Sequence, residues 1–270
     1  MIVTQCVKAL FSNGAKKYIA IAVFIVVVVC QAGLCADQKK TDPNQLFYNA
    51  NRSYEKRDYV KAVEDYVAIL DMGLENGTLY YNIGNGFLKL GKVGYAILCY
   101  EKAGRLIPQD SDLKANLAYA RSQVEAPAMA IPQENVILKG IKRLFEDFSL
   151  NMIALAALVL YLSVILIASF LMMSPAVRRF RFFSLLIIAF FLASLVGFGV
   201  RYYDEEILKH GIVVGREIEC KYEPIDKSTT YYRLQEGNDV LVMKTRDGWR
   251  QIRRLDGKIG WVKKEAVEEI

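Results

Sequence analysis

The 270-residue sequence holds a single histidine, His210, and no Cys-x-x-Cys motif. The sequence therefore offers almost no residues for a histidine base or for a histidine- or cysteine-rich metal site. We expect His210 to be solvated, or to lie at the level of lipid headgroups, in a link between segments. Five cysteines, six prolines and 18 glycines are too few for a disulfide-dense or collagen-like scaffold. At 53% apolar residues the chain also carries too much apolar surface for uniform disorder. We find no catalytic constellation and predict a non-enzymatic protein with no cofactor and no metal.

The sequence also lacks a basic folded face, although its net charge is +6. Residues 37–125 carry 12 basic and 12 acidic side chains, and residues 201–270 carry 14 of each. The excess positive charge flanks the apolar segments instead. A nucleic-acid partner, which needs a basic stripe on a folded domain, is therefore not expected.

Two long apolar runs, 150–173 and 182–200, are free of charged side chains. Each is long enough to cross a hydrocarbon core of about 30 Å as a helix, and the short link 174–181 requires a hairpin. A buried core helix pair is the alternative, but no soluble part of the chain is large enough to enclose both helices. The link carries Arg178, Arg179 and Arg181 without an acid, which predicts a cytoplasmic turn by the positive-inside rule.

The N-terminal segment 1–36 has a basic flank, an apolar run and then small residues, which predicts a secretory signal peptide or an uncleaved anchor. Lipidation is less favoured, because Cys35 follows the bulky Leu34. If this segment sends the following chain outward, the hairpin returns it to the same side. Both soluble parts are then expected outside the cytoplasm, on the periplasmic face of a bacterial inner membrane.

The linker 126–149 places Lys139, Lys142 and Arg143 on the outer side of the first span, where the positive-inside rule disfavours them. Acidic residues follow directly, at Glu146 and Asp147. We interpret this stretch as an amphipathic helix that lies in the membrane interface.

Residues 37–125 contain matching residues at a spacing of 34, with repeats at about 43–76 and 77–110 and a capping helix at 111–125. This period and pattern resemble tetratricopeptide repeats, which are α-α superhelical pairs of antiparallel helices. Small residues let the helices approach while aromatic residues fill the neighbouring space. The residues that carry the packing are Ala50, Ala62, Tyr66, Gly84, Phe87, Ala96, Tyr100 and Pro108.

The same resemblance implies a concave groove that holds an extended peptide, with asparagines that contact the peptide backbone. Asn51 and Asn85 occupy that position in the two repeats, and Tyr54 and Asn82 are further groove candidates. Alternatively, each asparagine only solvates an inner helix face or bonds locally.

Residues 205–270 change to short β-rich runs separated by turn signals such as Asp256-Gly257, which predicts a small β-barrel. The series resembles a bacterial SH3-like domain. Tyr222, Trp249 and Trp261 are candidates for a binding face, although Trp249 is as well explained as a cover for the core.

The order of signal, helical repeats, two-span hairpin and SH3-like barrel resembles the BatE-like proteins of the Bacteroides aerotolerance operon. The fold class expected is a multidomain α + β membrane protein. The resemblance implies an envelope protein that works beside von Willebrand A-type membrane proteins and a MoxR-type ATPase. We therefore expect an inner-membrane adaptor for protein partners in aerotolerance or envelope stress; the alternative is a peptidoglycan-binding membrane protein that uses its SH3-like domain.

Overall fold

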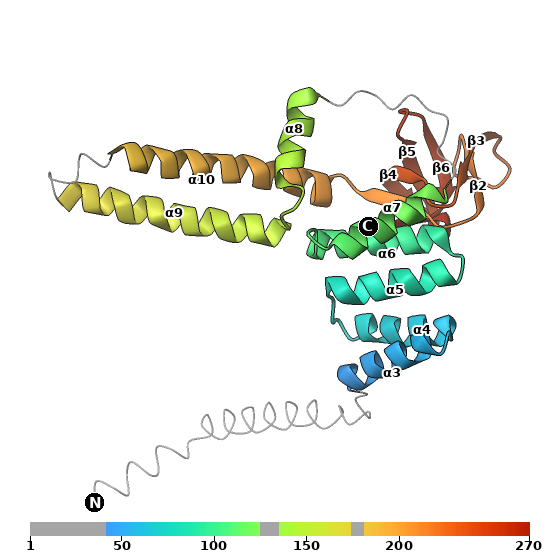
Figure 1. Ribbon diagram of the computed structural model, residues 1–270. Coiled ribbons are helices and arrows are strands. Elements are labelled where there is room, and N and C mark those ends of the chain that lie inside the picture. The colour runs from blue at the N-terminus through green and yellow to red at the C-terminus, as the bar shows by residue number, and fades with distance from the viewer. Residues whose placement is uncertain (1–41, 125–134, 174–180) are drawn as a thin grey trace, which may run out of the picture. The chain divides into compact units, whose positions relative to one another are not determined.

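The computed structural model describes residues 42–124, 135–173 and 181–270. Over these ranges the chain forms eight α-helices and a seven-stranded antiparallel sheet (Figure 1), which confirms the predicted mixture of α and β structure. The segment 1–36 and the turn arginines Arg178 and Arg179 lie outside the described residues. Arg181 begins a helix, but its side chain is also outside the described part.

Five short helices follow one another in the first described range. They are α3 (Pro43–Glu55), α4 (Tyr59–Asp71), α5 (Gly77–Lys89), α6 (Val93–Leu106) and α7 (Ser111–Ser122). Acidic or amide side chains cap three of them: Asp58, Asn76 and Asp110 accept hydrogen bonds from the backbone N–H groups of the following first turns. The short connections favour antiparallel neighbours.

The spacing of 34 residues reappears in the local backbone structure. The caps Asn76 and Asp110 are 34 residues apart and begin α5 and α7 in the same way. Arg57 (φ 64°) and Gly91 (φ 71°), also 34 apart, both adopt the left-handed conformation in the turns before α4 and α6. The repeated sequence therefore produces repeated turns as well as repeated helices.

Tyrosine and small residues fill the core between these helices. Tyr66 and Tyr100 are almost completely buried, and Ala50 and Ala96 have no exposed surface. A Cβ atom placed on Gly84 would lie 2.6 Å from Cε1 of Tyr100, so only glycine allows this approach.

Three further helices are α8 (Val136–Phe145), α9 (Leu150–Met173) and α10 (Arg181–Tyr202), and α10 continues into a π-helical turn over Tyr203–Ile207. Two helical stretches are long and apolar enough to cross a membrane: Leu150–Ala168 in α9, and Ser184–Ile207, which runs from α10 through the π-helical turn. They lie side by side (Figure 1), and the rings of Tyr161 and Phe191 are 5.9 Å apart.

The seven strands form one antiparallel sheet in the order β3-β2-β6-β5-β4-β1-β7. Their bounds are β1 (His210–Val213), β2 (Glu217–Lys221), β3 (Thr230–Gln235), β4 (Asp239–Arg246), β5 (Trp249–Arg254), β6 (Ile259–Lys263) and β7 (Val267–Glu269). Alternate residues such as Val240, Val242 and Ile252 face a buried apolar cluster. Asp247 and Gly248 both have positive φ, as a tight hairpin between β4 and β5 requires.

Candidate functional site

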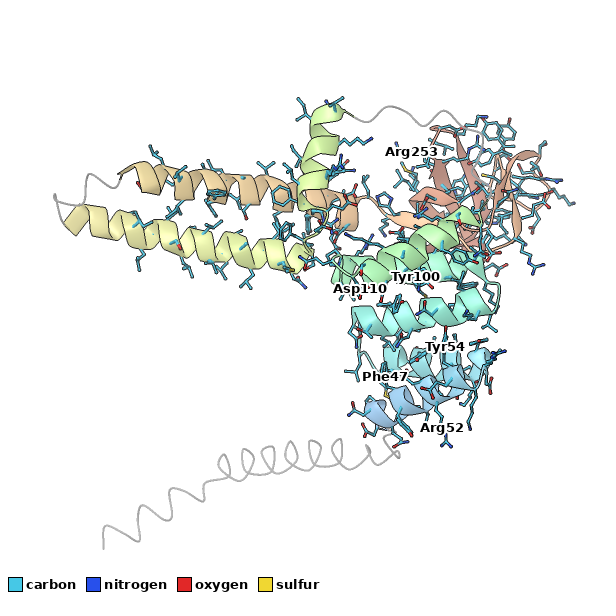
Figure 2. The ribbon with its side chains drawn as sticks, in the orientation of Figure 1. Phe47, Arg52, Tyr54, Tyr100, Asp110 and Arg253 are labelled. Atoms are coloured by element: carbon cyan, nitrogen blue, oxygen red, sulfur yellow. The ribbon has the colours of Figure 1, made fainter. Side chains whose placement is uncertain are left out.

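A cavity of about 200 Å³ opens among α3, α4 and α5. Its lining includes all four residues predicted to form a peptide groove, Asn51, Tyr54, Asn82 and Asn85. Glu55 and Tyr66 complete it. Figure 2 shows Tyr54 and Tyr100 within this stack of helices. The structure thus brings the groove candidates together, while peptide binding itself stays a prediction.

A tyrosine from the following helix holds each of the two repeated asparagines. The Tyr66 hydroxyl donates to Asn51 Oδ1 at 2.5 Å, and the Tyr100 hydroxyl donates to Asn85 Oδ1 at 2.7 Å. The two bonds join residues 15 apart, and the second pair repeats the first at the 34-residue spacing. Each carboxamide oxygen is therefore engaged, and among the residues that the structure describes neither Nδ2 group donates to a partner.

Asn116 of α7 extends this network, and sequence reasoning did not select it. Its Nδ2 donates to Asn85 Oδ1 at 2.9 Å and to the Tyr81 hydroxyl at 3.0 Å. The available signal was that Asn116 follows Asn82 by 34 residues. A row of amide and hydroxyl groups thus continues from α3 through α5 to α7.

Burial keeps the tyrosines of this network protonated. It raises the pKa of Tyr66 to about 12 and that of Tyr100 further still, and nearby tyrosines add to both shifts. Burial also raises the pKa of Tyr54, with smaller contributions from Tyr59 and Tyr81. At neutral pH the hydroxyls therefore remain hydrogen-bond donors to the asparagine oxygens.

The sheet carries a separate aromatic surface. The ring centroids of Tyr222 and Tyr231 are 4.3 Å apart, and those of Tyr231 and Tyr232 are 5.1 Å apart. The Arg254 guanidinium lies 4.6 Å from the Tyr232 centroid, and the Lys258 ammonium lies 5.9 Å from that of Tyr231. Tyr222 is 56% exposed, so this surface is open to solvent.

The two tryptophans predicted for the binding face are less accessible than Tyr222. Trp249 begins β5 and is only 8% exposed, with the Lys263 ammonium 5.9 Å from its ring centroid. Trp261 is half-buried in β6 and pairs across the sheet with Gln251 and Lys221. Little of the Trp249 ring is therefore left to touch a ligand.

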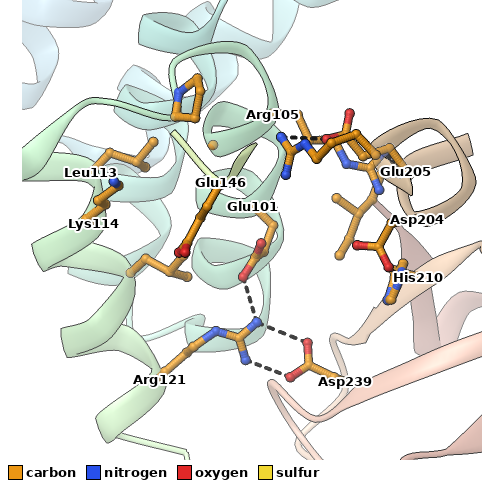
Figure 3. A pocket seen from close by; sticks show the side chains of 15 residues that line it. Glu101, Arg105, Leu113, Lys114, Arg121, Glu146, Asp204, Glu205, His210 and Asp239 are labelled. Carbon is orange, nitrogen blue, oxygen red and sulfur yellow. Dashed lines mark hydrogen bonds and ion pairs between the residues drawn. The ribbon is translucent and has the colours of Figure 1, made fainter. Parts of the chain in front are cut away.

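A charged cavity of about 340 Å³ lies where the helices approach the sheet (Figure 3). Arg121 of α7 donates to both carboxylate oxygens of Asp239, at 2.7 and 3.0 Å, and to Glu101 at 2.6 Å. Arg105 donates to the backbone oxygen of Ile270 at 3.0 Å. Most of these charges are paired with one another, so the cavity joins two parts of the chain rather than presenting free groups.

His210 also lines this cavity, and it belongs to strand β1 rather than to the link expected from the sequence. It is half-buried, with Nε2 at 3.8 Å from Asp204 Oδ1. The expected position of His210 in a link is therefore wrong, because its backbone pairs with Leu241 of β4 in the sheet.

Both cysteines in the described ranges are shielded from solvent. Cys99 and Cys220 are buried free thiols, and burial raises their pKa to about 12 and about 11. Thiols with such pKa values carry almost no thiolate at neutral pH and are weak nucleophiles. Among the described residues no group of three or more His, Cys, Asp or Glu side chains is arranged to hold a metal ion.

No protein-family model matches the sequence, and no curated protein is significantly similar to it. The resemblance to BatE-like proteins therefore stays a prediction.

Proposed function

We propose that this protein is a membrane-anchored adaptor whose helices α3–α7 form tetratricopeptide repeats that hold an extended peptide. The sheet β1–β7 is then an SH3-like barrel that serves as a second interaction module. Binding and positioning of protein partners, rather than catalysis, is the activity. The buried, protonated thiols and the internally paired charges support a non-enzymatic role.

The observation that carries the proposal is the repeated Tyr–Asn pair in the inner cavity. Within the described residues the Nδ2 groups of Asn51 and Asn85 donate to no partner, whereas their oxygens are occupied by Tyr66 and Tyr100. An extended peptide presents unpaired backbone carbonyls along its length, and fixed amide donors satisfy them. Because the tyrosines hold the amides in place, a peptide orders few side chains on binding.

The contacts between the helices and the sheet support placing both modules on one side of a membrane. Arg121 and Asp239 are separated in sequence by the two apolar helices α9 and α10, yet they form a bidentate ion pair. Two spans return the chain to its starting side, which is what this pair requires. We place both modules in the periplasm and the hairpin in a bacterial inner membrane, as the resemblance to BatE-like proteins implies.

The resemblance to BatE-like proteins also suggests which proteins the groove binds. We propose von Willebrand A-type membrane proteins of the same operon, with a MoxR-type ATPase system, as the proteins whose segments occupy the groove. A role in aerotolerance or envelope stress belongs to this proposal.

The groove is tested by exchanging the amide donors for acceptors. In Asn51→Asp plus Asn85→Asp, each carboxylate still accepts from its tyrosine but cannot donate to a peptide carbonyl. The full chain in detergent is used to select peptides from a displayed library, and affinities are measured by calorimetry. We expect the double variant to bind the selected peptides at least tenfold more weakly.

The matched control is Gln109→Glu plus Gln123→Glu, which adds the same two charges at exposed positions outside the cavity. It should bind as the unaltered chain does. Equal binding by the Asn51→Asp plus Asn85→Asp variant, or failure to select any peptide, would contradict peptide binding in this groove.

A second candidate function is peptidoglycan binding by the sheet, favoured by the exposed stack of Tyr222 and Tyr231. Sugar rings pack on exposed aromatic faces, and the neighbouring Lys258 supplies a cation for acidic groups. Sedimentation of the full chain with purified cell wall separates the two functions. Cell-wall binding that is lost in Tyr222→Ala and retained in Asn51→Asp plus Asn85→Asp would favour this second function.

A further inference from the structure

The helix α8 leaves apolar side chains uncovered beside the two membrane-length helices. Val136 is 84% exposed, and Ile137 and Leu144 are each 73% exposed. No residue of α8 is fully buried, and Lys139 and Lys142 lie across the helix from Ile137 and Leu144, with Val136 and Arg143 one above the other between these two faces. Such a separation of apolar and basic faces is typical of helices that lie in a membrane interface.

Contacts with α10 fix where α8 lies. A Cβ atom on Gly197 would be 2.5 Å from Cε1 of Phe145, so the Phe145 ring lies directly on the α10 backbone. Gly197 is one helical turn before Arg201, the first charged residue at this end of α10. Figure 1 shows α8 crossing α10 near this end. If α9 and α10 span a bilayer, α8 therefore lies at the boundary between hydrocarbon and headgroups.

A cavity of about 350 Å³ opens between α8 and the end of α10. Four cations line it, Lys139, Lys142, Arg143 and Arg201, against the two acids Glu146 and Asp204. Lys142 pairs with Asp204 at 2.8 Å and Arg201 pairs with Glu205 at 2.6 Å. Within the described residues, Lys139 and Arg143 form no ion pair, which leaves two cations available to a ligand.

We infer that this cavity binds the headgroup of an anionic phospholipid, with the acyl chains lying along the exposed apolar face of α8. A phosphodiester beside Lys139 and Arg143 at headgroup depth satisfies their charge, and the hydrocarbon below covers Ile137 and Leu144. The inference rests on the membrane insertion of α9 and α10 that belongs to the proposed function. It adds a lipid class and the residues that select it.

The test uses the full chain in a neutral detergent, titrated with dihexanoyl phosphatidylglycerol or dihexanoyl phosphatidylcholine and followed by native mass spectrometry. We expect the unaltered chain to prefer the anionic lipid. Lys139→Gln plus Arg143→Gln should weaken binding of the anionic lipid roughly 30-fold, because each basic side chain near an anionic headgroup contributes a factor of about five. Both residues are exposed, so the helix should still form.

The control Lys244→Gln plus Arg246→Gln removes the same two charges from exposed positions on β4 and should leave binding unchanged. Inorganic phosphate at the same concentration should not displace the lipid, and displacement would assign the site to free phosphate and overturn the inference. Equal binding of the two lipids, or undiminished binding by the Lys139→Gln plus Arg143→Gln variant, would also overturn it.

Carbonate extraction of cell membranes keeps this inference distinct from the proposed function. A chain that is released by carbonate is not an integral membrane protein, and both proposals fail together. A chain that is retained but shows no preference for the anionic lipid contradicts the headgroup site alone.

Discussion

The tyrosine hydroxyls in the helical core link the stability of the protein to alkaline pH. The pKa of Tyr66 is about 12 in the folded protein, against about 10 for an unperturbed tyrosine. The folded state therefore favours the protonated hydroxyl that donates to Asn51. Its contribution to stability is complete below about pH 10 and is lost as the pH rises toward 12.

We expect the thermal midpoint of the helical signal to stay level from pH 7 to about 9.5 and to fall steeply between pH 10 and 12. Circular dichroism of the full chain in detergent measures it. In Tyr66→Phe the fall should be shallower, because one titrating group is gone. An identical pH profile in that variant would contradict the role given to this hydroxyl.

Gly84 shows how a single atom decides the packing of the second repeat. Gly84→Ala places a methyl group 2.6 Å from the buried Tyr100 ring, which must shift and weaken its bond to Asn85. Overpacking costs about 1–3 kcal/mol, offset by about 1 kcal/mol of improved helix propensity.

Contacts of 2.6 and 2.7 Å to a buried ring place the cost in the upper half of this range. We therefore expect a net loss of about 1–2 kcal/mol in the free energy of unfolding, measured by denaturant titration of the full chain. Gly104→Ala is the matched control, because a Cβ atom on this helical glycine meets nothing within 4 Å, so the change there is in helix propensity and should stabilise the protein. A Gly84→Ala protein that is as stable as the unaltered chain would contradict the packing described here.

At the scale of the element, the turns before α4 and α6 carry a difference in strain between the two repeats. Arg57 holds a left-handed conformation with φ 64°, where the second repeat has Gly91 with φ 71°. This conformation costs a side-chain-bearing residue about 1–2 kcal/mol, whereas glycine adopts it freely.

Arg57→Gly should therefore stabilise the protein by about 0.5–1 kcal/mol, after the greater backbone freedom of glycine in the unfolded chain is counted. Gly91→Ala should destabilise it by about 1 kcal/mol. Denaturant titration measures both, and a destabilised Arg57→Gly protein would mean that the arginine side chain makes a contribution larger than the strain.

The elements that were predictable are those whose pattern is local. The 34-residue spacing indicated the helical pairs, and the length and lack of charge of 150–173 and 182–200 indicated the two apolar helices, α9 and α10. The sequence does not indicate strand β1, because four residues are too few to show an alternating pattern. His210 is therefore expected in a link. The place of β1 in the sheet depends on pairing with β4 and β7, which are distant in sequence.

The candidate site, too, could be predicted from the sequence only in part. Asn51 and Asn85 were selected because they repeat, and the structure places both on one cavity. Their bonds to Tyr66 and Tyr100 depend on how the helices pair, which spacing alone does not define. The ion pair of Arg121 with Asp239 joins residues 118 positions apart, and no local pattern points to it.

At the scale of the whole molecule, the ion pair of Arg121 with Asp239 joins helix α7 to strand β4. Arg121 is partly exposed, so Arg121→Ala should cost about 1 kcal/mol or less in overall stability. It should, however, release the sheet from α7. We expect faster amide hydrogen exchange in β1 and at the Gly94 amide, which donates to Glu236, while α3 and α4 are unaffected.

Hydrogen-exchange mass spectrometry of the full chain in detergent measures this effect. Lys114→Ala is a suitable control, because its ion pair with Asp147 does not involve the sheet. Unchanged exchange in β1 would mean that the remaining contacts alone hold the helices and the sheet together.

We propose that α9 and α10 form a membrane hairpin that leaves α3–α7 and the sheet together on its outer face. Protease is added to intact spheroplasts, with antibodies to 43–122 and 210–270 as probes and lysed spheroplasts as the control. Both regions should be digested from outside while a fragment containing α9 and α10 is protected. Survival of either region in intact spheroplasts, with its digestion after lysis, would show that this region does not lie on the outer face.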